Sequence, residues 1–344
     1  MTTISKPNIL LLYTGGTIGM VKDTDTGALV AFNFNKLLKN IPELKLLDCN
    51  IATISFDKPI DSSNMNIEGW VKIAQMIEDN YQQYDGFVVL HGSDTMSYSA
   101  SALSFMLENL EKPVVFTGSQ LPIGDLRTDA KENLITAIQV ASLQENGKPQ
   151  VAEVCLYFEY KLYRGNRTTK ISAEHFNAFT SPNFPSLAES GVHLKVNEEY
   201  LFKKNSTKQL QVNSKFDANV AIVKIFPGLN ESVIKAILSI PDLKGVVLET
   251  YGSGNAPTED WFVGQLEEAI KKGIHIINVT QCSGGSVNMG QYETSSQLKQ
   301  IGVISGKDIT TEAAITKLMY LLGQNVAGNV FKTIFETSLR GEME

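Results

Sequence analysis

The chain has 344 residues and a formal net charge of −7, with 43% hydrophobic and 19% charged residues. This is the composition of a globular protein. Its length exceeds what one hydrophobic core usually organises, so we expect two domains. The acidic balance, without any long run of like charge, argues against binding to nucleic acid or to an anionic membrane, because both need a basic face.

The N-terminal sequence does not resemble a signal peptide. Its apolar stretch, 9–13, is short and leads directly into a glycine turn, whereas a signal peptide has a basic start and a longer apolar core. No segment approaches the roughly 18 apolar residues of a membrane span. The three cysteines, Cys49, Cys155 and Cys282, contain no CxxC pair, which favours reduced thiols. We therefore expect a cytoplasmic protein with neither a metal site nor a membrane partner.

Short apolar runs alternate with helical patterns along the chain, which predicts parallel sheets covered by helices. A polar stretch at 197–215 interrupts this rhythm and is interpreted as a linker between an N-terminal α/β domain (1–196) and a C-terminal α/β domain (216–344). The predicted strands are 8–13, 86–90, 114–117 and 154–158, then 220–225, 245–249 and 274–279. The predicted helices are 66–84, 97–110 and 134–141, then 232–238, 259–271, 311–322 and 331–339.

Two glycine-containing turns follow predicted strands and carry hydroxyl groups: TGGTIG at 14–19 and HGSDT at 91–95. Ligands of parallel α/β sheets bind at the carboxyl ends of the strands. Glycine at such a turn allows the backbone N–H groups to approach a ligand closely. These turns are therefore the candidate sites of chemistry.

A hydroxyl needs a base, or an environment that favours the alkoxide, before it is an effective nucleophile. The four histidines, His91, His175, His193 and His275, show no triad spacing. Lys170, in RGNRTTK at 164–170, is a candidate base, because a lysine in a packed site can lose its charge. The carboxylate of Asp94 could orient it.

Each motif taken alone has a simpler interpretation. TGGTIG matches neither the GxGxxG nor the P-loop pattern, so nucleotide binding is weakly supported. HGSDT alone is compatible with a helix start capped by Ser93 or Asp94. RGNRTTK alone is typical of a solvated basic loop.

Taken together, the motifs resemble the L-asparaginase family, specifically its cytoplasmic type I enzymes. The resemblance extends along essentially the whole chain. In order, the motifs are YTGGTIGM (13–20), DSSNM (61–65), YDGFVVLHGSDTM (84–96), ALSFMLENL (102–110), TGSQLP (117–122), LYRGNRTTK (162–170), TSPN (180–183), YGSGNAP (251–257), NVTQC (278–282), GVISG (302–306) and LRGEM (339–343). The fold implied is a larger flavodoxin-like N-terminal α/β domain followed by a smaller α/β domain.

The resemblance also implies roles for individual residues. Thr14 would attack the side-chain carboxamide of L-asparagine, release ammonia and form an ester that water hydrolyses. The second hydroxyl relay of the site would consist of Ser93, Asp94 and Lys170. Substrate would be held by Ser62 together with Asp94, Ser63 and Gly92, and Asn255 would reach the site of a neighbouring subunit in a homodimer or homotetramer. The resemblance implies no metal and no organic cofactor.

Three departures from the family pattern are visible. Ser93 stands where the usual motif has a threonine, so its rotamer lacks the restriction of a β-methyl group. Ala28 stands where many members have a tyrosine on a mobile loop. Bacterial type I enzymes with a second asparagine site use an arginine and a cysteine; this chain has Cys282 but Glu249 at the arginine's position. Because an acid repels a carboxylate, we expect weak or absent activation by asparagine.

Three alternatives remain. The related subunit that supplies ammonia for glutaminyl-tRNA formation carries an added N-terminal domain, for which a TGGT motif at Thr14 leaves no room, and it engages tRNA, which an acidic chain disfavours. A glutaminase-asparaginase of broader specificity is possible, because one methylene is a modest difference for a pocket. A non-catalytic asparagine sensor on the same fold is favoured only by Ala28.

Overall fold

The structure is a computed structural model that describes residues 6–22, 29–31, 41–203, 208–290 and 293–344. The chain forms two compact units. The first comprises Met1–Ser181 and Pro185–Ser214, and the second comprises Pro182–Phe184 and Lys215–Glu344. Most of the segment at 197–215, interpreted above as a linker, thus groups with the first unit. The expected α/β fold class is confirmed in both units.

The first unit is built on an eight-stranded sheet in the order β15-β14-β11-β10-β7-β5-β1-β4. The strands β4, β1, β5, β7 and β10 are parallel. Numbered by their place in the chain, these five follow the order 2-1-3-4-5 of flavodoxin-like sheets. The bounds are β1 Asn8–Tyr13, β4 Asn50–Ser55, β5 Gly86–Leu90, β7 Val114–Thr117, β10 Val154–Phe158, β11 Lys161–Arg164, β14 Ala188–Ser190 and β15 Leu194–Val196.

All four strands predicted for this sheet are present, but β4 was not predicted. Its sequence NIATIS pairs only with β1, and its side chains are exposed or half-buried. An edge strand of this kind lacks the continuous apolar run by which a buried parallel strand is recognised. The antiparallel strands β11, β14 and β15 were also not predicted, because each is only 3 or 4 residues long and gives too short a pattern to recognise.

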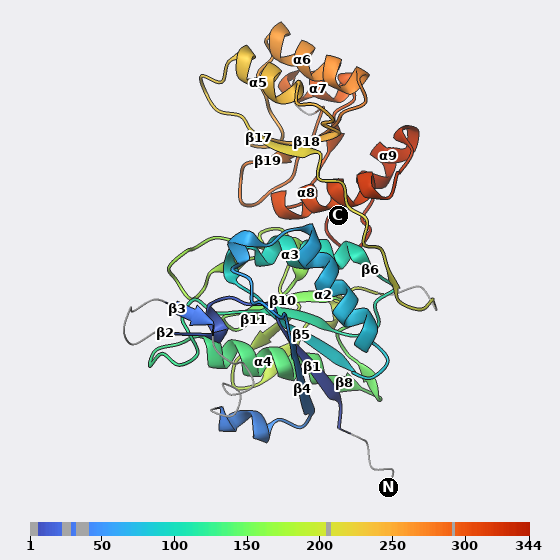
Figure 1. The fold of residues 1–344 in the computed structure, drawn as a ribbon. Helices are drawn as coiled ribbons and strands as arrows, with labels where there is room; N and C mark the ends of the chain where they lie inside the picture. The colour runs from blue at the N-terminus through green and yellow to red at the C-terminus, as the bar shows by residue number, and fades with distance from the viewer. Residues whose placement is uncertain (1–5, 23–28, 32–40, 204–207, 291–292) are drawn as a thin grey trace. The chain divides into compact units, whose positions relative to one another are not determined.

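Helices cover both faces of this sheet. Figure 1 shows α2 (Ile67–Asn80) and α3 (Met96–Met106) on one face and α4 (Ala130–Ser142) on the other. The side chain of Asn66 caps α2 by accepting a hydrogen bond from the N–H of Gly69 at 3.0 Å. α3 ends earlier than predicted, because the chain turns at residue 107 into a short strand, β6 (Leu107–Glu108).

Short two-stranded antiparallel pairs complete the first unit. β6 pairs with β16 (Gln211–Val212), which attaches the end of the polar stretch to the first unit. The other two-stranded pairs are β2 (Met20–Lys22) with β3 (Leu29–Ala31), β8 (Gln144–Glu145) with β9 (Lys148–Pro149), and β12 (Thr169–Lys170) with β13 (Phe179–Thr180).

The second unit is a four-stranded parallel sheet, β17-β18-β19-β20, with helices on both faces (Figure 1). The predicted strands and helices are all present, whereas β20 and α7 were not predicted. The bounds are β17 Val220–Lys224, β18 Gly245–Thr250, β19 His275–Thr280 and β20 Ile304–Ser305, with α5 Glu231–Leu238, α6 Asp260–Lys271, α7 Glu293–Ile301, α8 Thr311–Gly323 and α9 Gly328–Phe335. Within the described part of the chain, no helix is both long and apolar enough to cross a membrane.

A fully buried ion pair explains the terminal LRGEM motif. The ammonium of Lys317, on α8, contacts the carboxylate of Glu342, and both side chains have 0% exposure. Burial opposes ionisation of Glu342, but Lys317 and the backbone N–H groups of Leu339 and Arg340 outweigh this effect and lower the pKa of the carboxyl group. The C-terminal segment is therefore attached to the second unit by a polar contact that excludes water.

Candidate active site

The TGGTIG and HGSDT turns meet at the carboxyl ends of β1 and β5, which are neighbouring strands. The N–H of Thr14 donates to the carbonyl of Leu90 at 3.0 Å, and its hydroxyl donates to the same oxygen at 2.9 Å. Thr14 is 1% exposed. This is the point at which the strand order reverses, where ligands of such sheets bind. The peptide carbonyl orients the Thr14 proton but cannot take it away.

Two glycines allow the TGGTIG turn to approach the segments next to it. Gly15 and Gly16 have φ values of +136° and +87°, which residues with a side chain rarely adopt. A Cβ on Gly15 would lie 2.0 Å from the carbonyl oxygen of Ile60, and one on Gly16 would lie 2.5 Å from the nitrogen of Gly92. Any larger residue would therefore separate the TGGTIG turn from its neighbours.

The DSSNM segment forms the third turn of the site. Ser62 is 4% exposed, and its carbonyl accepts a hydrogen bond from the hydroxyl of Thr95 at 2.7 Å. A Cβ on Gly92 would lie 2.4 Å from the Ser62 hydroxyl oxygen. Asp61 accepts hydrogen bonds from the N–H and the hydroxyl of Ser63, and these bonds lower its pKa. The structure thus brings Ser62 beside Gly92, whereas Ser63 is exposed and bonded to its own turn.

Lys170 reaches the site from the β12–β13 hairpin. Its ammonium donates to the hydroxyl of Ser93 at 2.8 Å and to a carboxylate oxygen of Asp94 at 2.7 Å. The Lys170 side chain is 17% exposed and that of Asp94 is 65% exposed. Pairing of Lys170 with Phe179 orients the strand from which this side chain extends. The structure thus places the side chains of Ser93, Asp94 and Lys170 together.

The segment before Lys170 is not a solvated basic loop, so that interpretation is wrong. Residues 164–168 are all buried. Asn166 donates to the hydroxyl of Ser104 at 3.1 Å. The Thr168 hydroxyl donates to the carbonyl of Gly165 at 2.8 Å and accepts from the hydroxyl of Ser97 at 3.0 Å. Because both serines lie on α3, the turn is attached to the helix that follows the HGSDT motif.

Arg164 begins this buried turn and forms an internal ion pair. Its guanidinium contacts the carboxylate of Glu153 at 2.6 Å and donates to the carbonyl of Tyr200 at 2.7 Å. Glu153 also accepts from the N–H of Phe202 at 2.8 Å. Arg164, the first arginine of the RGNRTTK motif, therefore has a structural role. Together with Glu153 it attaches the segment at residues 200–202 to the rest of the first unit.

The HGSDT motif begins a helix, but neither Ser93 nor Asp94 caps it. The residue at the start of α3 is Thr95, and its side chain makes no capping hydrogen bond. The side chains of Ser93 and Asp94 bond to Lys170 instead. The capping interpretation is therefore wrong, because tertiary contacts have engaged both polar groups.

His91 is buried and neutral. Burial lowers its pKa to about 4. Its Nδ1 lies 2.7 Å from the carbonyl of Gly92, which only accepts, so Nδ1 carries the proton and Nε2 accepts from the hydroxyl of Ser99 at 2.9 Å. Ser99 in turn accepts from the indole of Trp70 at 2.9 Å. His91 thus supports the HGSDT turn and is not a base.

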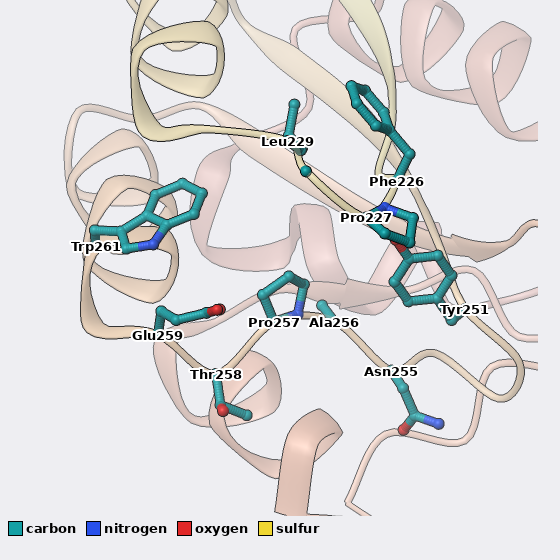
Figure 2. A pocket seen from close by; sticks show the side chains of 11 residues that line it. Phe226, Pro227, Leu229, Tyr251, Asn255, Ala256, Pro257, Thr258, Glu259 and Trp261 are labelled. Carbon is teal, nitrogen blue, oxygen red and sulfur yellow. The ribbon is translucent and has the colours of Figure 1, made fainter.

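Three further residues singled out from the sequence lie in the second unit. Asn255, on the loop after β18, lines an open groove of about 530 Å³, and Figure 2 shows it near Tyr251. The carboxylate of Glu249 accepts from the hydroxyl of Thr311 at 2.7 Å and lies 3.9 Å from the ammonium of Lys224. Cys282 is exposed. Ala28 lies outside the described residues.

The sequence interpretation missed Gln120. The amide oxygen of this residue accepts a hydrogen bond from the Ser93 hydroxyl at 3.1 Å. A signal for it existed, because TGSQLP follows β7, and β7 lies next to β5 in the sheet. Among the described residues, no cluster of three or more His, Cys, Asp or Glu side chains is placed to hold a metal ion.

The fold and the site define a two-domain α/β enzyme with two hydroxyl side chains and a lysine at the switch point of its larger sheet. Two family models match the chain, "Asparaginase, N-terminal" over residues 8–201 and "Glutaminase/Asparaginase C-terminal domain" over residues 219–335. The chain therefore belongs to the asparaginase family of amidohydrolases.

Individual relatives agree with this assignment. The chain is 43% identical to L-asparaginase 1 of Escherichia coli K12 over 342 residues, 99% of each protein. It is 42% identical over 359 residues to a Mus musculus protein named 60 kDa lysophospholipase, covering 97% of this chain and 62% of that protein. Its structure resembles L-asparaginase I of Vibrio cholerae with a TM-score of 0.90 and 41% identity, covering 98% of this chain and 99% of the other.

Replacing Gly92 with alanine should separate the HGSDT turn from Ser62. The added methyl group would lie 2.4 Å from the Ser62 hydroxyl oxygen, so one turn must move. Since a displacement of about 1 Å costs roughly 100-fold in rate, we expect a loss of that size in amidohydrolase activity. Gly124→Ala is the matched control, because a Cβ at that position would meet no atom of a residue beyond its chain neighbours within 4 Å. Equal activities in the two variants would contradict the tight approach.

The lowered pKa of His91 predicts a pH-dependent stability. The unfolded chain binds a proton at this side chain near pH 6.5, whereas the folded chain does so only at about pH 4. The contribution of neutral His91 to the free energy of unfolding is therefore fully present above pH 6.5. It falls by about 3 kcal/mol as the pH is lowered to 4. Urea unfolding should show this fall relative to His91→Gln. A difference between the two proteins that does not change with pH would contradict a buried neutral His91.

Proposed function

We propose that the protein hydrolyses L-asparagine to L-aspartate and ammonia through an ester on Thr14. The observation that carries the proposal is the position of the Lys170 ammonium, bonded to both Ser93 and Asp94 on the turn beside Thr14. Pure binding of an amino acid requires neither two hydroxyl groups nor a lysine placed in this way. Membership of the asparaginase family supports the same reaction.

In the proposed first step, the Thr14 oxygen attacks the side-chain amide carbon of asparagine. The carbon–nitrogen bond breaks, and the nitrogen leaves as ammonia with the proton from the hydroxyl. Water then adds to the β-aspartyl ester, releasing L-aspartate and restoring the Thr14 hydroxyl. Backbone N–H groups of the two glycine turns would stabilise the oxyanion of each tetrahedral intermediate, normally a large contribution to catalysis.

The proposed relay of Ser93, Asp94 and Lys170 would move protons in these steps. Ser62, with Asp94, would hold the α-carboxylate and α-amino groups of the substrate, and Ser63 and Gly92 would lie beside them. The burial of Ser62 next to Gly92 supports this arrangement. No metal and no organic cofactor take part in the proposed reaction.

We further propose that the enzyme acts in the cytoplasm as a homodimer or homotetramer, with no nucleic-acid or membrane partner. In this proposal Asn255 of one subunit contributes to the site of another. The side chain is half-buried at the edge of an open groove, in a place where a second chain can reach it. The composition and the similarity to L-asparaginase 1 support the proposed location.

Thr14→Ala should abolish ammonia release from L-asparagine, because removal of a nucleophile costs at least about 1,000-fold in rate. Ammonia release is measured with L-asparagine and with L-glutamine across substrate concentrations, and the exposed Thr333→Ala serves as the control. We expect asparagine to be the better substrate. Comparable rates for the two amides would support a glutaminase-asparaginase. Binding of asparagine by a wild-type protein that hydrolyses neither amide would support a sensor instead.

The rate should depend hyperbolically on asparagine concentration. The Glu249 carboxylate would repel the carboxylate of an effector, and it is already bonded to Thr311 and close to Lys224. We expect Cys282→Ser to leave the shape of the rate curve unchanged. The control variant Cys49→Ser, in the first unit, should also leave it unchanged. A sigmoidal wild-type curve that becomes hyperbolic in Cys282→Ser would overturn this prediction.

A further inference from the structure

Gln120 belongs to a motif that the proposed mechanism leaves without a role. It lies on the loop directly after β7, so its backbone emerges beside the HGSDT turn that follows β5. The side chain is half-buried. It links the turn that carries Ser93 with the hairpin that carries Lys170, although these segments are far apart in the sequence.

The orientation of the Gln120 amide follows from its two partners. Its nitrogen donates to the backbone carbonyl of His175 at 3.2 Å. Because a carbonyl only accepts, the NH2 group must face His175 and the amide oxygen must face Ser93. That oxygen accepts the Ser93 proton at 3.1 Å.

The backbone of Gln120 is held as firmly as its side chain. The carboxylate of Asp129 is 3% exposed and accepts from the N–H of Gln120 at 2.9 Å and from that of Leu121 at 3.2 Å. The amide of Asn133 donates to the same carboxylate at 3.3 Å. Gln120 is therefore a fixed acceptor, in contrast to a surface side chain that changes its rotamer freely.

Ser93 needs an external restraint of this kind. A serine hydroxyl has three staggered rotamers and no β-methyl group to restrict them. Its single proton points to Gln120, while Lys170 donates to one of its lone pairs, which leaves the second lone pair for substrate or water. We propose that Gln120 is a positioning residue that fixes the rotamer and the proton direction of Ser93. The inference rests on the proposed function only for its effect on rate.

Gln120→Leu removes both side-chain hydrogen bonds and keeps a similar volume. Gln120 also lines an open cavity of about 650 Å³, so a branched side chain has room there. Losing one orienting hydrogen bond should lower kcat for asparagine about tenfold and change KM less than about twofold. The matched control is Gln139→Leu, at an exposed position of α4.

A double-mutant cycle separates positioning from a general structural role. In the Ser93→Ala background, Gln120→Leu should change kcat less than about twofold, because the group that it orients is gone. A further tenfold loss in that background would overturn the proposal. Urea unfolding of each variant shows whether the fold is retained.

Crystal structures of the wild type and Gln120→Leu provide a readout that does not depend on turnover. Ser93 should occupy one rotamer in the wild type and more than one, or a different one, in the variant. An unchanged single rotamer in Gln120→Leu would overturn the inference. If the wild type releases no ammonia from asparagine, the proposed function fails, while the Ser93 rotamers still decide the role of Gln120.

Discussion

The parallel pairing of β1 with β5 is the constraint on which the rest of the site depends. It places Tyr13 opposite Leu90, so the chain leaves both strands at the same edge of the sheet, and the backbone of Thr14 bonds to Leu90. Two turns that start so close together can continue only if their backbones nearly touch. Gly16 and Gly92 make this contact possible, because no side chain fits between them.

Lys170 comes from a different part of the chain, and its position depends on a buried polar turn. Burial of residues 164–168 is costly unless their polar groups find partners. Arg164 pairs with Glu153, and Asn166 and Thr168 bond to serines of α3. These contacts fix the base of the hairpin, so the lysine extends from a rigid support rather than from a free loop.

The serines of α3 link the HGSDT turn with the buried turn before Lys170. Ser97, Ser99 and Ser104 are all buried, which is unusual for a helix packed against a sheet. Ser97 and Ser104 contact the turn before Lys170, and Ser99 contacts His91 at the start of the HGSDT motif. The helix α3 therefore positions the supports of both Ser93 and Lys170. A neutral His91 suits this role, because a buried charge at that point would destabilise the packing.

The sequence by itself determined the α/β class, the main strands and helices, and the turns at 14–19 and 91–95. These features are local, since apolar runs, helical periodicity and glycine at strand ends are all encoded in short segments. It did not determine the half-buried edge strand β4, whose side chains lack a continuous apolar run. The RGNRTTK motif taken alone also suggested a solvated loop at 164–170, because basic and polar residues are usually exposed.

Only the tertiary structure decided which polar groups meet. Whether Ser93 caps a helix or bonds to Lys170, and whether Gln120 contacts anything, depends on which strands are neighbours and on how closely the turns approach. Hydrogen bonds between residues 76 or 77 positions apart carry no local signal. The resemblance to the asparaginase family supplied the association of Ser93, Asp94 and Lys170 in advance. The partners of Gln120 and His91 became visible only when the three turns and α3 were packed together.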